Sequence, residues 1–85
     1  MQAYLATFAS THAAMAFEAS FGAGGALVPV PPTLRAGCGM AWRFAAAGDE
    51  AARGRAARAA AGADLRPADW ELHAQEGGAW RPVAP

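Results

Sequence analysis

Cys38 is the only cysteine in the chain, and it lies between two glycines in the segment "PTLRAGCGMAWRF" (32–44). A lone thiol can act as a small buried apolar group, a metal ligand, a nucleophile or a sulfur carrier. Gly37 and Gly39 allow successive backbone N–H groups to turn toward one anion, which would stabilise a thiolate or a persulfide. A glycine-flanked loop between two strands favours an accessible thiol, although the residues alone leave packing open.

Three ionisable side chains are candidates to assist that thiol. Arg35 and Arg43 flank it in the sequence, and nearby positive charge favours the thiolate. His12 follows a serine and a threonine at the start of an expected helix, where it could act as a base toward Cys38 or donate to an anion. The alternative for His12 is an exposed or capping histidine without a chemical role.

Metal binding is poorly supported by the residue types. A structural zinc site takes four ligands, and soft copper sites commonly use two thiolates. The chain offers one cysteine and two histidines, His12 and His73. The sequence therefore predicts no metal site and no cofactor within one chain. A dithiol redox pair is excluded because there is no second cysteine.

Composition limits the remaining function classes. The chain of 85 residues fits one small domain, and most of its 54% hydrophobic residues are alanines. The formal net charge is zero, which argues against a nucleic-acid-binding surface. No segment approaches the roughly 20 apolar residues of a membrane span. A lone cysteine without a signal peptide predicts a cytoplasmic protein.

Periodicity and turn signals predict six elements in positions 1–75. Strands are expected at 3–8, 26–32, 40–45 and 68–74. Helices are expected at 10–21, capped by Ser10 or Thr11 and ended by Gly22, and at 50–61, closed by Gly62. Pro29 lacks an N–H donor and is therefore expected on an edge strand or at a strand end. Asp49 is the expected cap of the second helix. Residues 76–85 are expected to form a Gly/Pro-rich C-terminal tail.

The order strand, helix, strand, strand, helix, strand predicts an α+β fold. With right-handed crossovers it closes into a ferredoxin-like βαββαβ sandwich, a four-stranded antiparallel sheet with two helices on one face. This fold would place Cys38 in the loop between the second and third strands, and His12 at the first turn of the first helix.

Two segments resemble the small selenium/sulfur carrier-like domains. They are "YLATFASTHAAMAFE" (4–18) and "PVPPTLRAGCGMAWRF" (29–44), and the likeness covers roughly residues 3–45 well. The shared elements are Thr7–Phe8, Ser10–Thr11–His12, Glu18, Pro29–Val30–Pro31, Cys38–Gly39–Met40–Ala41 and Arg43–Phe44. Two departures are Pro32, where the family often has arginine, and residues 35–37, which replace a serine-rich run.

The resemblance implies a non-enzymatic carrier that holds sulfur or selenium on Cys38 as a persulfide or perselenide. A cysteine desulfurase or a selenocysteine lyase would be the donor, and a second enzyme would be the acceptor. The absence of a second cysteine suits this role, because no neighbouring thiol can resolve the persulfide. The alternative is a ferredoxin-like interaction or regulatory module, with a homodimer as one form, and a metal chaperone shared across a dimer is weaker.

Overall fold

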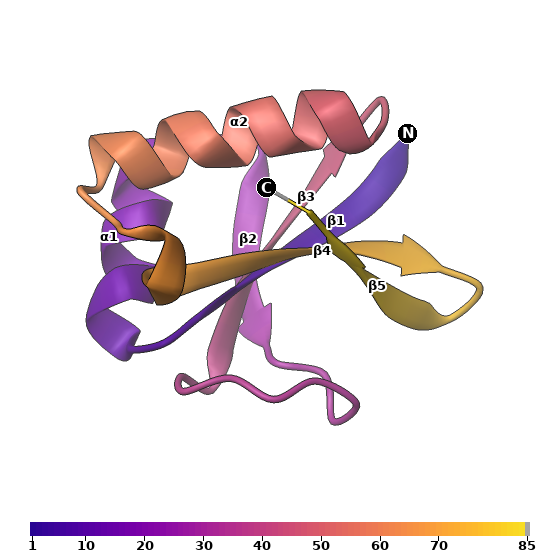
Figure 1. Ribbon diagram of the computed structural model, residues 1–85, viewed down its shortest axis with the longest axis horizontal. Helices are drawn as coiled ribbons and strands as arrows, with labels where there is room; N and C mark the ends of the chain where they lie inside the picture. Colours follow the sequence, from indigo (N-terminus) through magenta and orange to yellow (C-terminus); the bar gives the residue numbers. More distant parts are fainter. Residues whose placement is uncertain (85) are drawn as a thin grey trace.

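The computed structural model describes residues 1–84. Figure 1 shows a twisted sheet with both helices packed on one side of it. The elements in chain order are β1 (Gln2–Phe8), α1 (Thr11–Phe21), β2 (Gly25–Pro29), β3 (Met40–Ala46), α2 (Asp49–Gly62), a 3₁₀ turn (Pro67–Asp69), β4 (Trp70–Glu76) and β5 (Ala79–Val83). The six elements expected from the sequence are all present, with small shifts at their ends.

The sheet has five strands in the order β2-β3-β1-β4-β5, and every neighbouring pair is antiparallel. The predicted α+β class and antiparallel sheet are therefore confirmed, and β2, which ends at Pro29, lies at an edge as expected. The predicted count of four strands is wrong. The ferredoxin-like assignment stays a prediction.

The fifth strand lies inside the segment 76–85 that the sequence predicts as a tail. Gly77 and Gly78 have φ of 58° and 83°, the conformation of a tight two-residue hairpin turn that turns β5 back along β4. Pro82 lacks an N–H donor, and its strand accordingly lies at the outer edge of the sheet. The glycine pair is a hairpin signal rather than a mark of a loose end.

Large aromatic side chains fill the space between the sheet and the helices. Tyr4, Phe8 and Phe17 are almost completely buried there, and the ring centroids of Phe8 and Phe17 are 5.1 Å apart. Burial of a side chain of this size contributes about 1.5–3 kcal/mol. The buried face of α2 consists of alanines, Ala52, Ala56, Ala59 and Ala60. A helix with such a face can approach its neighbours closely, and α2 packs along α1.

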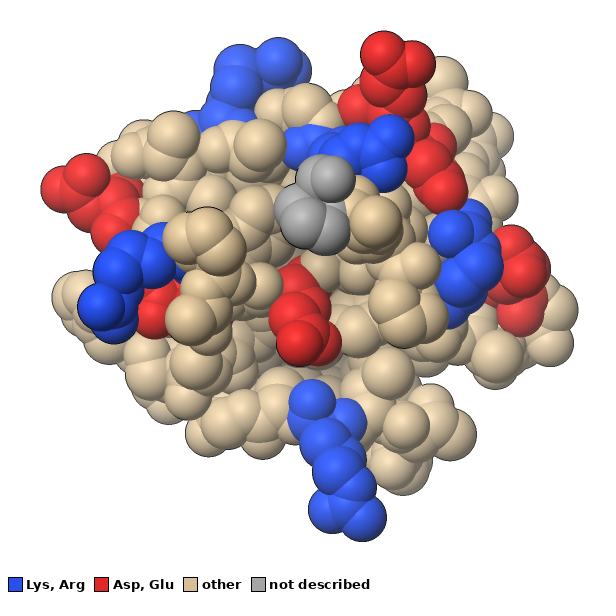
Figure 2. Space-filling model, in the orientation of Figure 1, with Lys and Arg blue, Asp and Glu red and all other residues tan. Residues whose placement is uncertain are grey.

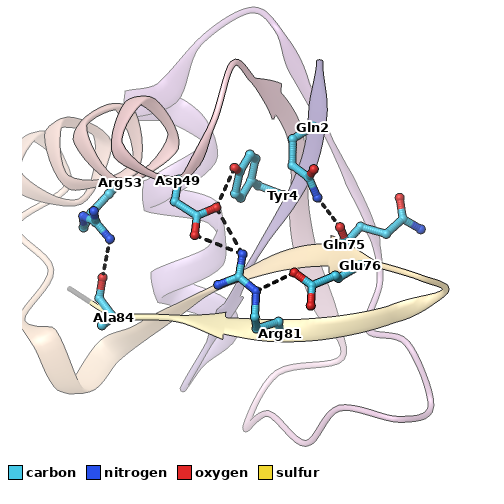
Figure 3. A network of polar contacts seen from close by, with 8 residues as sticks. All are labelled: Gln2, Tyr4, Asp49, Arg53, Gln75, Glu76, Arg81 and Ala84. Atoms are coloured by element: carbon cyan, nitrogen blue, oxygen red, sulfur yellow. Dashed lines mark hydrogen bonds and ion pairs between the residues drawn. The ribbon is translucent and has the colours of Figure 1, made fainter.

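A polar network joins β5 to the start of α2 (Figure 3). The hydroxyl of Tyr4 donates to Asp49 at 2.8 Å, and Arg81 donates to both oxygens of Asp49 at 3.3 and 3.0 Å. Arg81 also donates to Glu76 at 2.9 Å. Asp49 is the first residue of α2, after Gly48, and the helix start has no side-chain cap. The expected capping role of Asp49 is wrong, because its carboxylate faces Tyr4 and Arg81 instead.

The network shifts the pKa values of three of its members, and it raises the pKa of Arg81 through the hydrogen bonds to Glu76 and then to Asp49. Burial, followed by the hydrogen bond to Asp49, raises the pKa of Tyr4. The hydrogen bonds from Tyr4 and then from Arg81 lower the pKa of Asp49. Asp49 is therefore a carboxylate at neutral pH in the folded protein, and it links the C-terminal hairpin to the start of α2.

Candidate functional site

Cys38 lies at the end of the loop between β2 and β3, where this loop meets the end of β1 and the start of α1. The N–H of Cys38 donates to the carbonyl of Phe8 at 3.2 Å. The N–H of Val30 donates to the carbonyl of Gly39 at 3.0 Å and closes the base of the loop. The loop is the long magenta connection at the lower end of the sheet in Figure 1.

Gly37 seats this loop against the connection between β1 and α1. A Cβ atom at Gly37 would collide with the backbone carbonyl of Ala9, so only glycine fits this approach. Gly39 faces open space, and neither of these glycines has a positive φ. Residues 37–39 therefore lack the alternating right- and left-handed form of an N–H nest, and the N–H of Cys38 is already used by the carbonyl of Phe8.

The sulfur of Cys38 has two polar neighbours. The N–H of Met40 donates to Sγ at 3.4 Å, and Oγ1 of Thr11 lies 3.6 Å from Sγ. Thr11 is the first residue of α1, and the preceding residue, Ser10, caps the helix by accepting the N–H of Ala13 at 3.1 Å. The sulfur therefore lies beside the N-terminal turn of a helix, where the peptide dipoles place about half a positive charge. The sulfur is thus next to two groups that can donate hydrogen bonds to it.

The thiol is nevertheless covered. Cys38 is only 5% exposed and packs with the buried core residues. The expectation of an accessible thiol is therefore wrong for this conformation. The physical reason is Gly37, whose missing side chain allows the loop to lie directly on Ala9 instead of giving it freedom.

The arginines and the histidine predicted to assist the thiol are not its hydrogen-bonding neighbours in residues 1–84. Arg43 lies on the opposite face of the sheet, with its guanidinium 5.9 Å from the ring centroid of Trp80. Arg35 is exposed in the loop. His12 is exposed on α1 near Asp69, whose pKa is lowered chiefly by the hydrogen bond from the Arg66 backbone and also by the charge of His12.

The position of Arg43 could be predicted from the sequence, whereas the contact between Thr11 and Cys38 could not. Alternation along β3 already separates Arg43 from Trp42 and Phe44, which are buried in the helix-side core, so the far position of Arg43 could have been predicted. The sequence pattern indicates only that Thr11 lies at the start of a helix. Its contact with Cys38 spans 27 positions of sequence, and no local pattern predicts such a pairing.

Within residues 1–84, no group of three or more His, Cys, Asp and Glu side chains is arranged to hold a metal ion. In the same part of the chain, neither helix is long and apolar enough to cross a membrane. The site thus consists of one sulfur, a backbone N–H and a hydroxyl. Such a set offers one sulfur atom together with two groups that can donate hydrogen bonds to it.

Residues 3–60 match the model of a protein family described as "Putative Se/S carrier protein-like". The match covers more than half of the chain and includes α1, the loop, Cys38 and most of α2. No curated protein and no solved structure matches the chain. The likeness seen in the sequence near Cys38 is thus confirmed at the level of the family, and the chain belongs to the Se/S carrier protein-like family.

Proposed function

We propose that this protein is a small non-enzymatic carrier that holds one sulfur or selenium atom on Cys38. The observation that carries the proposal is the position of the only cysteine sulfur, beside the first turn of α1 and within reach of the Met40 N–H and the Thr11 hydroxyl. Membership of the family supports it. A persulfide is anionic at neutral pH, and these donors favour an anion.

The transfer needs no oxidant or reductant. The Cys38 thiolate attacks the outer sulfur of a persulfide on the donor, a new S–S bond forms on Cys38, and the donor leaves as a thiolate with the electron pair. A nucleophile on the acceptor later takes the outer sulfur, and the Cys38 thiolate is restored. The same sequence of bonds applies to selenium. No second cysteine is present to expel the outer atom within the chain.

The donor that fits this chemistry is a cysteine desulfurase or a selenocysteine lyase, and the acceptor is an enzyme that uses the delivered atom in the same reducing cytoplasm. Because Cys38 is 5% exposed, the loop of residues 30–39 has to move before a partner can reach the sulfur. We infer that donor binding opens this loop at Gly37, where it lies on Ala9.

The test is mass spectrometry of the intact protein after incubation with a cysteine desulfurase and free cysteine. We expect a mass increase of one sulfur atom that is removed by a thiol reductant. The matched control is Cys38→Ser, which is expected to show no increase. The proposal is wrong if the wild-type protein gains no sulfur, or if Cys38→Ser gains it equally.

The burial of Cys38 favours a second candidate, an interaction or regulatory module without thiol chemistry that acts as a homodimer or with another partner. In that case Cys38 fills space in the core, as lone cysteines often do. Alkylation with a small reagent separates the two. If Cys38 in the presence of the desulfurase reacts no faster than in the free protein, the module is favoured over the carrier.

We also infer that the fold is a ferredoxin-like sandwich extended by one strand. The order of the first four strands across the sheet, β2-β3-β1-β4, and the packing of both helices on one face support this. The fifth strand is then an additional edge strand that pairs with β4, and the position of Cys38 is the same as in the four-stranded fold.

A further inference from the structure

A small pocket of about 220 Å³ lies at the end of the sheet, next to the segment that carries Cys38. Gly37 lines one side of the pocket. Thr7 of β1 and Trp70 and Glu71 of β4 line another side. Arg35 from the loop closes a further side. The sulfur itself is not part of the lining, so the pocket is a separate feature that shares only the loop with the site described above.

Two side chains of opposite charge line this small space. Arg35 and Glu71 are both exposed, and Oε2 of Glu71 lies 3.8 Å from Nε2 of His73. Over the face of the molecule drawn in Figure 2, acidic and basic side chains are interspersed, without a broad patch of one sign. A simple anion would be attracted by Arg35 but repelled by Glu71. The charge pattern therefore suits a molecule that carries both signs.

A buried hydroxyl adds a directional group to the pocket. Thr7 is 3% exposed and lines the pocket, and its Oγ1 lies 3.1 Å from Nε2 of His73. His73 is 5% exposed, and burial lowers its pKa, so the ring is neutral at neutral pH and carries one N–H.

Which ring nitrogen of His73 carries the hydrogen decides whether the Thr7 hydroxyl donates to His73 or accepts from it. In residues 1–84, Nδ1 of His73 is buried without a hydrogen-bond partner. A buried N–H without an acceptor is rarer than an acceptor without a donor. The proton is therefore assigned to Nε2, which donates to Oγ1 of Thr7. The hydrogen of the Thr7 hydroxyl is then left to donate to a ligand in the pocket.

We propose that this pocket binds a small zwitterionic α-amino acid. Its carboxylate pairs with Arg35 and accepts the hydrogen of Thr7, and its ammonium group pairs with Glu71. The volume of about 220 Å³ lies below the roughly 300–1,000 Å³ of pockets for drug-sized molecules, which excludes nucleotides and similar ligands. This role goes beyond the carrier function and does not require it, although a ligand here would touch the loop that covers Cys38.

The test is an NMR titration of the full chain with L-cysteine under reducing conditions. We expect saturable shifts of the backbone amides of Thr7 and Gly37. Cysteamine lacks the carboxylate and 3-mercaptopropionate lacks the ammonium group, so each should bind roughly fivefold more weakly or worse, the effect of losing one partly solvated ion pair. Cys38→Ser should bind like the wild type, so that failure of the carrier function and failure of this proposal can be distinguished.

Variants locate the binding. Arg35→Gln and Glu71→Gln should each weaken L-cysteine binding, whereas Arg58→Gln, which removes an exposed arginine on α2, should not. Both test side chains are on the surface, so the variants are expected to fold, and the amide spectrum reports this directly. The proposal is overturned if L-cysteine gives no saturable shift, if either analogue binds as tightly as L-cysteine, or if both test variants bind like the wild type.

Discussion

The turn at Gly77–Gly78 and the loop at Gly37–Gly39 each contain two glycines, and the glycines serve different physical purposes. Gly77 and Gly78 adopt positive φ and face open space, so they are needed for backbone conformation. Gly37 has no unusual φ, but a side chain there would collide with Ala9. The first pair makes a hairpin by local geometry, and Gly37 makes a tertiary contact that buries a thiol.

The largest expected effect comes from Gly37→Ala. The new Cβ meets the rigid carbonyl of Ala9, so the backbone has to move, and overpacking of this kind costs about 1–3 kcal/mol. The free energy of unfolding from urea denaturation measures the loss. Alkylation of Cys38 should become faster at the same time, because the loop no longer rests on Ala9.

The control within the same loop is Gly39→Ala. Its Cβ would enter open space at an ordinary φ, so the free energy of unfolding should change by less than about 0.5 kcal/mol. Equal losses for Gly37→Ala and Gly39→Ala would contradict the close approach to Ala9.

A smaller effect is expected from Gly78→Ala in the hairpin turn. The φ of 83° at Gly78 is unfavourable for a residue with a side chain, and the left-handed region costs roughly 1–2 kcal/mol. Urea denaturation measures this, and Gly78→Asn should lose less, since asparagine tolerates this region better. Alkylation of Cys38 should keep its wild-type rate, and a faster rate would show that the two glycine segments are coupled.

The smallest effect concerns the hairpin's attachment to α2 and depends on pH. The pKa of Asp49 is lowered in the folded protein from 3.8 by the hydrogen bonds from Tyr4 and Arg81. A lowered pKa gives stability that is present above the unfolded pKa and is lost as the pH falls through the folded pKa. The free energy of unfolding should therefore fall in acid, and it should fall less in Asp49→Asn.

Urea denaturation at about pH 6 and about pH 3 measures this difference. Glu50→Gln is the matched control, because it removes the exposed carboxylate next along α2. If Glu50→Gln reduced the acid dependence as much as Asp49→Asn, the network in Figure 3 would not be its source.

Most of the fold was predictable from local signals, and the exceptions have identifiable causes. Ser10 and Gly22 mark the ends of α1 as expected, and alternation along β3 separates its buried and exposed residues. β5 was missed because five residues with a proline carry a weak strand pattern. The Gly77–Gly78 pair is a two-residue hairpin signal in its own right, and it was the evidence that the sequence offered for β5.

The sequence by itself determined that one thiol is available, that it lies between two strands, and that the chain resembles the selenium/sulfur carrier-like domains. Only the tertiary structure decided that Cys38 is buried, that Thr11 makes the side-chain polar contact with its sulfur, and that a pocket lined by Arg35 and Glu71 adjoins the loop. The reason is that strand and helix patterns depend on neighbours along the chain. Burial and side-chain contacts depend on segments brought together by folding.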